Sequence, residues 1–173
     1  MPRLHAVDHD STGLLEQTRR QLGRVPNLYA SMAAGPAALS GYLAMRDALT
    51  DGELTPRLRE QIALLVAQLN ACTYCVSAHA LRSSRLLHMS AQEVSDTRSG
   101  LDADPHAQAV LTLTRRLVED RGRVADADIT DARAHGVTDG EMAEITAHIA
   151  LNTLSNYFNH LAQPELDFPE MPA

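Results

Sequence analysis

The stretch that most constrains the fold is residues 55–71, "TPRLREQIALLVAQLNA", which has the pattern of a helix that is apolar on more than one side. Thr55 suits the N-cap, and Pro56 then takes the first helical position, where its missing N–H leaves no bond unmade. The main apolar stripe recurs at helical spacing and comprises Leu58, Ile62, Leu65, Val66 and Leu69. The second apolar side includes Leu64 and Ala67 and also carries Glu60. We therefore expect this helix to be buried on several sides.

The rest of the chain carries helix start and stop signals and shows no convincing strand alternation. Ser11 or Thr12 would cap a first helix that Gly23 ends. Two capping boxes are expected, one formed by Ser90 with Glu93 and one by Thr138 with Glu141. Helices are expected within residues 11–26, 34–49, 51–71, 70–87, 88–96, 104–120, 126–136 and 137–152, the last continuing or bending into 153–162.

The composition agrees with an all-α fold. The chain is 45% hydrophobic, but only 3% of its residues are aromatic and it has no Trp. Its core must therefore be built from Ala, Leu, Val, Ile and Met, which favours packed helices over a β-sandwich. The length suits one domain over residues 1–173, with residues 1–10 and 165–173 expected to be loosely ordered tails.

Charge and hydropathy exclude several classes of partner. The net charge of −7 argues against nucleic acid, because phosphate binding needs clustered basic side chains. No apolar run approaches the roughly 20 residues of a membrane span. The N-terminus, "MPRLHAVDHD", has no apolar segment of the secretory type. We therefore expect a cytoplasmic protein, in which two cysteines are more often catalytic or metal-binding than a permanent disulfide.

Both cysteines of the chain lie in "NACTYCVSAH", residues 70–79. In a helix, Cys72, Cys75 and His79 occupy positions i, i+3 and i+7 and share one face. Asn70 is a suitable N-cap and would place Cys72 in the first turn, where the helix dipole stabilises a thiolate. An imidazole one turn from Cys75 can take a thiol proton. The stretch therefore offers a reactive thiolate, a second thiol and a base.

Glu60 has two possible environments. A carboxylate on a buried apolar face must be paired, hydrogen-bonded or protonated, because desolvation disfavours its charge. Alternatively, Glu60 reaches solvent in the first turn of its helix, where a negative charge suits the helix dipole. The sequence does not choose between these two.

Two interpretations of the cysteine stretch compete with a redox centre. The cysteines could simply pack in the core, with His79 on the surface. A zinc site could use C-x2-C-x3-H with Glu60 as a fourth ligand, although structural zinc usually joins separate segments. A thioredoxin fold is unsupported because no βαβ pattern surrounds the motif, and c-type haem is excluded because Val76 follows Cys75. No metal or other cofactor is expected.

Glu60, Cys72, Cys75 and His79 are separated by eleven, two and three residues. This spacing resembles the E-x11-C-x2-C-x3-H signature of the AhpD-like branch of the carboxymuconolactone decarboxylase superfamily. Residues 25–49 and 144–169 also resemble the segments before and after the motif in peroxidase-related members. The resemblance covers roughly residues 20–170 and implies an all-α fold that assembles into homo-oligomers, commonly trimers or hexamers.

The resemblance also implies a thiol-dependent alkylhydroperoxidase that reduces organic or hydrogen peroxides. Cys75 would be the peroxidatic thiol and Cys72 the resolving thiol. Glu60 and His79 would form the proton relay, and an external dithiol or disulfide reductase would restore the dithiol. The position within the helix instead favours Cys72 as the more acidic thiol. We give the base one turn from Cys75 more weight and follow the resemblance.

The chain departs from the best-known AhpD proteins at one position. Those proteins have a histidine directly before the second cysteine, where this chain has Tyr74. Tyr74 would either hydrogen-bond the relay or merely pack against it. The branch of the superfamily that decarboxylates carboxymuconolactone lacks the cysteine pair, so that activity is not expected. The alternatives are a general thiol–disulfide oxidoreductase or redox sensor, and a helical metal-binding or scaffolding protein without turnover.

Overall fold

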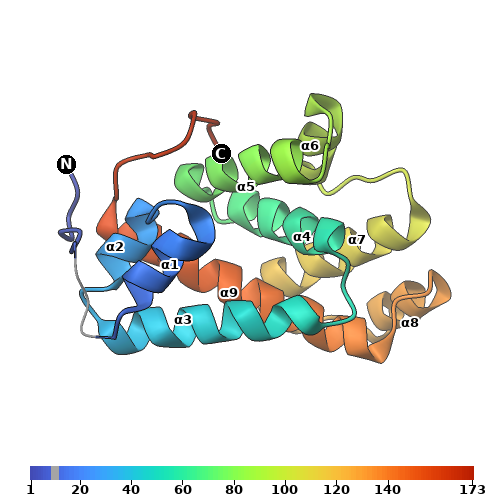
Figure 1. Ribbon diagram of the computed structural model, residues 1–173. Coiled ribbons are helices and arrows are strands. Elements are labelled where there is room, and N and C mark those ends of the chain that lie inside the picture. The colour runs from blue at the N-terminus through green and yellow to red at the C-terminus, as the bar shows by residue number, and fades with distance from the viewer. Residues whose placement is uncertain (9–11) are drawn as a thin grey trace.

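The computed structural model describes residues 1–8 and 12–173 of the chain. These residues form nine α-helices and one short 3-10 helix, with no strand among them, as the all-α prediction requires (Figure 1). The elements are α1 (Leu14–Leu22), α2 (Asn27–Met32), α3 (Pro36–Ala48), η1 (Leu49–Asp51), α4 (Pro56–Leu69), α5 (Thr73–Leu86), α6 (Ala91–Arg98), α7 (Pro105–Glu119), α8 (Asp126–Ala134) and α9 (Asp139–Ala162).

Helix α4 lies at the centre and packs against α5, α6, α7 and α9 (Figure 1). The Thr55 hydroxyl accepts a hydrogen bond from the Leu58 N–H at 3.2 Å, and Pro56 occupies the first turn. Both apolar sides of α4 are covered: Ile62 and Leu64 have no exposed surface. The prediction that this helix is buried on several sides is confirmed.

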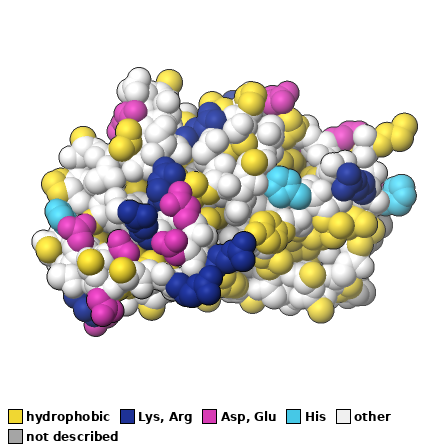
Figure 2. All heavy atoms as spheres, turned by 180° about the vertical axis from the view of Figure 1, so that it is seen from behind, with side chains coloured by type: hydrophobic (Ala, Val, Ile, Leu, Met, Phe, Trp, Pro, Cys, Tyr) yellow, Lys and Arg dark blue, Asp and Glu magenta, His cyan; other side chains and the backbone are white. Residues whose placement is uncertain are grey.

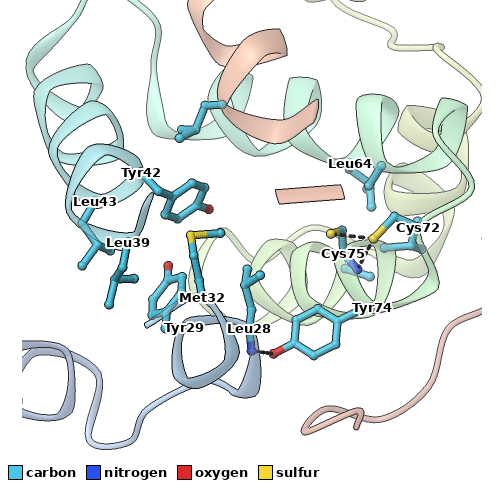
Figure 3. Packing of buried hydrophobic residues seen from close by; sticks show 14 of the residues in the cluster. Leu28, Tyr29, Met32, Leu39, Tyr42, Leu43, Leu64, Cys72, Tyr74 and Cys75 are labelled. Carbon is cyan, nitrogen blue, oxygen red and sulfur yellow. Dashed lines mark hydrogen bonds between the residues drawn. The ribbon is translucent and has the colours of Figure 1, made fainter. Parts of the chain in front are cut away.

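Two clusters of buried side chains meet at α4. The first joins α2, α3 and α5, and it contains Leu28, Met32, Leu64 and both cysteines (Figure 3). The second joins α4, α7, α8 and α9, and it comprises Leu54, Leu58, Ile62, Val66, Ala107, Ala109, Val110, Leu113, Ala132, Val137 and Ile145. The second cluster is wholly aliphatic, as the composition predicts, whereas the first also contains Tyr29, Tyr42 and Tyr74.

Helix α9 is a single helix of 24 residues, so the predicted segments 137–152 and 153–162 are continuous. The Thr138 hydroxyl accepts from the Glu141 N–H, and the Glu141 carboxylate accepts from the Thr138 N–H, both at 3.0 Å. The Ser90–Glu93 capping box is present at α6 as well. Both boxes confirm the sequence-based starts of these helices.

The start of α5 differs from the prediction. Asn70 is the C-cap of α4, and Cys72 is the N-cap of α5. Between them Ala71 has a φ of 52°, and the Cys72 N–H donates to the Ala67 carbonyl at 2.9 Å. The chain therefore turns sharply from α4 into α5, and Cys72 precedes the first helical turn instead of lying within it.

Two smaller differences concern the N-terminal region. The prediction did not include helix α2, which follows Pro26. Helix α1 begins after Gly13, whose φ of 74° is left-handed, so Thr12 is not its N-cap. The alternative cap, Ser11, lies outside the described residues. Gly23 ends α1 as predicted.

Residues 163–173 have no helix but contact α5 across its outer side. The Phe168 ring packs edge-on against Tyr74 with centroids 5.4 Å apart. The Met171 N–H donates to the Ser77 hydroxyl at 2.8 Å. The segment that the sequence suggests is loose therefore has specific attachments to α5.

Across residues 1–8 and 12–173, none of the helices combines the length and apolar character that crossing a membrane requires.

Candidate functional site

The turn between α4 and α5 brings the two cysteines together. Their Sγ atoms are 2.7 Å apart, and both residues are buried, with 2% and 3% of their surface exposed. The Cys75 N–H points at Cys72 Sγ at 3.3 Å, so Cys72 caps its helix with sulfur where other helices use a side-chain oxygen (Figure 3). The arrangement places a potential thiolate against a free backbone donor of the first turn.

Asn159 of α9 is the third member of this group. Its Nδ2 lies 3.0 Å from Cys75 Sγ and 3.9 Å from Cys72 Sγ, and only 5% of the residue is exposed. Sequence reasoning did not find it, because it lies 84 residues beyond Cys75. A signal exists in the sequence: Asn152, Asn156 and Asn159 recur at helical spacing on a helix that is otherwise largely apolar.

The pKa values of the two thiols are shifted in opposite directions. The hydrogen bond from the Cys75 thiol lowers the pKa of Cys72 to about 7, helped by the Cys75 N–H and opposed by burial. Donating to Cys72 raises the pKa of the Cys75 thiol well above its ordinary value, and burial raises it further. At rest the charge therefore belongs on Cys72, as its place at the helix start predicts, and the proton on Cys75.

Glu60 and His79 form a second polar pair between α4 and α5. His79 Nδ1 is 2.8 Å from Glu60 Oε2, and Arg82 Nη2 is 2.9 Å from Glu60 Oε1. Burial raises the pKa of Glu60, but His79 and the nearby arginine charges outweigh burial and the pKa lies below its ordinary value. Of the two environments that the sequence allowed, Glu60 takes the buried and paired one, with 9% exposure.

Tyr74 points away from the sulfur atoms. Its hydroxyl accepts a hydrogen bond from the Leu28 N–H at 3.2 Å, and its ring meets Phe168 (Figure 3). Its hydrogen bond and its ring contact are with α2 and the C-terminal segment, and neither is with Glu60 or His79. Of the two roles open to it, packing fits this position.

Further polar side chains of α9 surround the site. Asn70 Nδ2 donates to Asn156 Oδ1 at 3.0 Å, and His160 Nε2 lies 2.7 Å from the Asn70 carbonyl oxygen. His160 thereby ties α9 to the turn that carries Cys72. His148 is buried farther along α9, where desolvation lowers its pKa.

Two further observations concern clusters of potential metal ligands and the distribution of surface charge. Among the described residues, no three His, Cys, Asp or Glu side chains are grouped so that they could hold a metal ion. On the face seen in Figure 2, arginine side chains lie beside acidic ones and do not gather into a broad basic surface. These findings leave the dithiol and the Glu60–His79 pair as the chemically distinctive features.

Comparison with known proteins finds a matching family model and several solved structures of similar fold. The family model for the carboxymuconolactone decarboxylase family matches residues 36–115. A search of curated proteins finds no significant match.

Three solved structures have the same architecture. An uncharacterised peroxidase-related protein with an AhpD core from Ralstonia eutropha JMP134 is 29% identical, with a TM-score of 0.77 over 89% of this chain and 83% of that chain. An uncharacterised peroxidase-related protein from Silicibacter sp. TM1040 is 22% identical, with a TM-score of 0.79 over 99% and 93%. The debrominase Bmp8, in a complex with 2,3,4-tribromopyrrole, is 16% identical, with a TM-score of 0.78 over 96% and 93%.

The family model covers α3 to α7 and so includes all four residues of the spacing Glu60–Cys72–Cys75–His79. The solved structures extend the likeness to most of the chain. The family match and these structures therefore support the resemblance to the AhpD-like branch of the carboxymuconolactone decarboxylase superfamily.

Proposed function

We propose that this protein is a cysteine-based oxidoreductase of the alkylhydroperoxidase type, which reduces a peroxide while Cys72 and Cys75 become a disulfide. The observation that carries the proposal is the pair of buried sulfur atoms 2.7 Å apart, one helical turn from the paired His79 and Glu60. A packing role for the cysteines would require neither the short contact nor a buried acid–base pair beside them.

The reaction balances with the two thiols as the only reductant. The Cys75 thiolate attacks the hydroxyl oxygen of the hydroperoxide and the O–O bond breaks. The alkoxide takes a proton and leaves as the alcohol. Cys75 is now a sulfenic acid. The Cys72 thiolate attacks its sulfur, the S–O bond breaks and, with one further proton, water is released. The peroxide has gained two electrons, and the dithiol has become a disulfide.

Glu60 and His79 supply and accept the protons of this cycle. The low pKa of Glu60 makes it a carboxylate at neutral pH, so it accepts a hydrogen bond from the Nδ1–H of His79. This bond fixes the tautomer in which His79 Nε2 is free to exchange a proton. Because the His79 side chain is 20% exposed, the relay also connects the buried site to solvent.

The cycle needs an external electron donor. A dithiol attacks the Cys72–Cys75 disulfide through a mixed disulfide and leaves both cysteines reduced. A small dithiol or the dithiol of a disulfide reductase provides this chemistry, so we propose such a partner for the protein.

The proposal is tested by single-turnover oxidation. The protein is reduced, freed of reductant and mixed with one equivalent of tert-butyl hydroperoxide, and intact mass and free thiols are followed. Fast loss of both thiols and of two hydrogen atoms supports the peroxidase. Thiols that react no faster than a free small-molecule thiol contradict it.

Two other oxidants then distinguish the remaining functions. Fast reaction with a low-molecular-weight disulfide, but not with peroxide, would identify a general thiol–disulfide oxidoreductase. Because a debrominase has the same fold, 2,3,4-tribromopyrrole is the second compound to test. Its reduction would exchange C–Br for C–H and release bromide while the disulfide forms.

Replacing Glu60 by glutamine should slow peroxide turnover by about 10²-fold, the usual size of a general acid–base contribution. The amide oxygen can still accept from His79, so the fold is retained, but it no longer stabilises a positive imidazole. Steady-state turnover and far-UV circular dichroism are the measurements. Glu119→Gln is the matched control, because Glu119 is exposed and pairs with Arg115 of its own helix, α7. Equal turnover in both variants would remove Glu60 from the relay.

We also propose that copies of the chain associate through the outward side of α9. Leu154, Tyr157 and Leu161 are 47%, 62% and 58% exposed and form one stripe. Small residues continue this stripe toward the helix start at Ala143, Ala147 and Ala150, with a spacing of four and three residues throughout. Two α9 helices paired antiparallel about a two-fold axis would place the large half of each stripe against the small half of the other.

Tyr157→Glu should therefore lower the mass of the particle in solution, because a carboxylate would be buried at the contact. Light scattering coupled to size-exclusion chromatography measures this mass. Leu101→Glu is the control, since Leu101 is 54% exposed and far from α9 in sequence. A wild-type protein that is monomeric, or an assembly that Tyr157→Glu leaves intact, would rule out this surface.

A further inference from the structure

The two sulfur atoms of the dithiol have different hydrogen-bond donors. Cys72 Sγ faces the Cys75 N–H at 3.3 Å and the Cys75 thiol at 2.7 Å. Cys75 Sγ has no such backbone donor and instead faces the Asn159 amide at 3.0 Å, while the same amide lies 3.9 Å from Cys72 Sγ. The backbone N–H therefore serves Cys72, whereas the Asn159 amide lies closer to Cys75 than to Cys72.

Two sulfur atoms at this distance can share one proton. The thiolate forms at the sulfur that receives the stronger hydrogen bonds, and the proton stays on the other sulfur. The cap position favours charge on Cys72, which leaves Cys75 protonated and unable to attack. The Cys72 thiolate is itself the nearest base to the Cys75 proton. Transfer between them yields the Cys75 thiolate without any other group, provided that something stabilises the charge at Cys75.

Asn159 is placed to provide that stabilisation. It is 5% exposed, and its Oδ1 is buried with no hydrogen-bond partner among residues 1–8 and 12–173. The hydrogen bonds of the side chain are those from Nδ2 to sulfur. A buried amide without full pairing is unfavourable, which makes a purely structural role for it weak. Turned by half a rotation, the same amide would offer its oxygen to a protonated Cys75, so its two orientations suit the two positions of the proton.

We propose that Asn159 is a positioning residue that shifts the negative charge of the dithiol from Cys72 to Cys75, and so selects the sulfur that attacks. The selection of the attacking sulfur rests on the proposed function. The distribution of charge does not, and it can be measured without any peroxide.

The test compares the sites at which a small electrophile reacts. The fully reduced protein is treated with limiting iodoacetamide over a range of pH, and fragment mass spectrometry assigns each adduct to Cys72 or Cys75. Asn159→Ala should lower the fraction of adduct at Cys75 by about tenfold, the effect of losing one hydrogen bond to a charged group. Asn152→Ala is the matched control, because Asn152 is buried on the same helix but donates to the His148 carbonyl and not to sulfur.

A second variant gives a result even if Asn159→Ala fails to fold. Asn159→Asp keeps the shape of the side chain but replaces the donor with a carboxylate, so it should reduce Cys75 modification further and shift its onset to higher pH. Site fractions that are unchanged in both Asn159 variants would overturn the proposal. If the fractions shift as expected but no variant, nor the wild type, reduces peroxide, the charge distribution stands and the peroxidase proposal fails.

Discussion

Cys75→Ser is expected to abolish peroxide reduction, because a serine hydroxyl is neither acidic nor nucleophilic enough to attack the O–O bond. The remaining Cys72 cannot form the intramolecular disulfide, so the proposed two-cysteine cycle cannot close. Turnover with an excess of dithiol and tert-butyl hydroperoxide should fall to the rate of the dithiol alone. Because serine is close in size to cysteine, the circular dichroism spectrum should be unchanged.

Cys72→Ser separates the two roles. If Cys75 attacks first, this variant still consumes one equivalent of peroxide and stops at a sulfenic acid, which dimedone traps at Cys75. The alternative is that Cys72 attacks first, because Cys72 has the lower pKa. A one-equivalent burst in Cys75→Ser, with the sulfenic acid at Cys72, would exchange the two assignments and would also remove the reason for a charge shift by Asn159.

The largest expected effect on stability is at Ile62. This residue has no exposed surface and lies in the cluster that joins α4 to α7, α8 and α9. Ile62→Ala removes three buried carbon atoms from a close-packed site, so the free energy of unfolding should fall by about 2–5 kcal/mol. Urea titration of the reduced protein measures the change through the midpoint, with the slope unchanged.

Leu101→Ala is the control for that measurement. Leu101 is also a large aliphatic residue, but 54% of it is exposed, so truncation should alter stability by less than about 0.5 kcal/mol. Equal losses in the two variants would mean that the second cluster does not carry the packing energy that its burial suggests. Retained thiol chemistry in folded Ile62→Ala would show that this cluster is separate from the site.

Much of the fold could be predicted because local signals agreed. Thr55 and Pro56 start α4, the two capping boxes start α6 and α9, and no segment shows a competing strand pattern. Where the prediction was wrong, the local signal was ambiguous. Asn70 has the side chain of an N-cap, but the chain uses it to end α4, and the tight turn through Ala71 leaves the cap to a cysteine.

The site was only partly visible in the sequence. The nearness of Cys75 and His79 could be inferred from one helical turn, whereas the pairing of His79 with Glu60 was expected from the family resemblance alone. Asn159 enters from α9, and no local rule connects that helix to the cysteine turn. The greater acidity of Cys72 was anticipated from its place near the helix start, although the cap responsible is its own sulfur and not Asn70.

The near-complete burial of both sulfur atoms has a kinetic consequence. A reagent too wide for the closed protein can reach them only after a local opening, so its observed rate should level off at the opening rate as its concentration rises. A reagent of a few heavy atoms should show no such plateau. The two rate curves would then give the rate of local opening around the cysteines. The protein would select oxidants by their width in addition to their chemical reactivity.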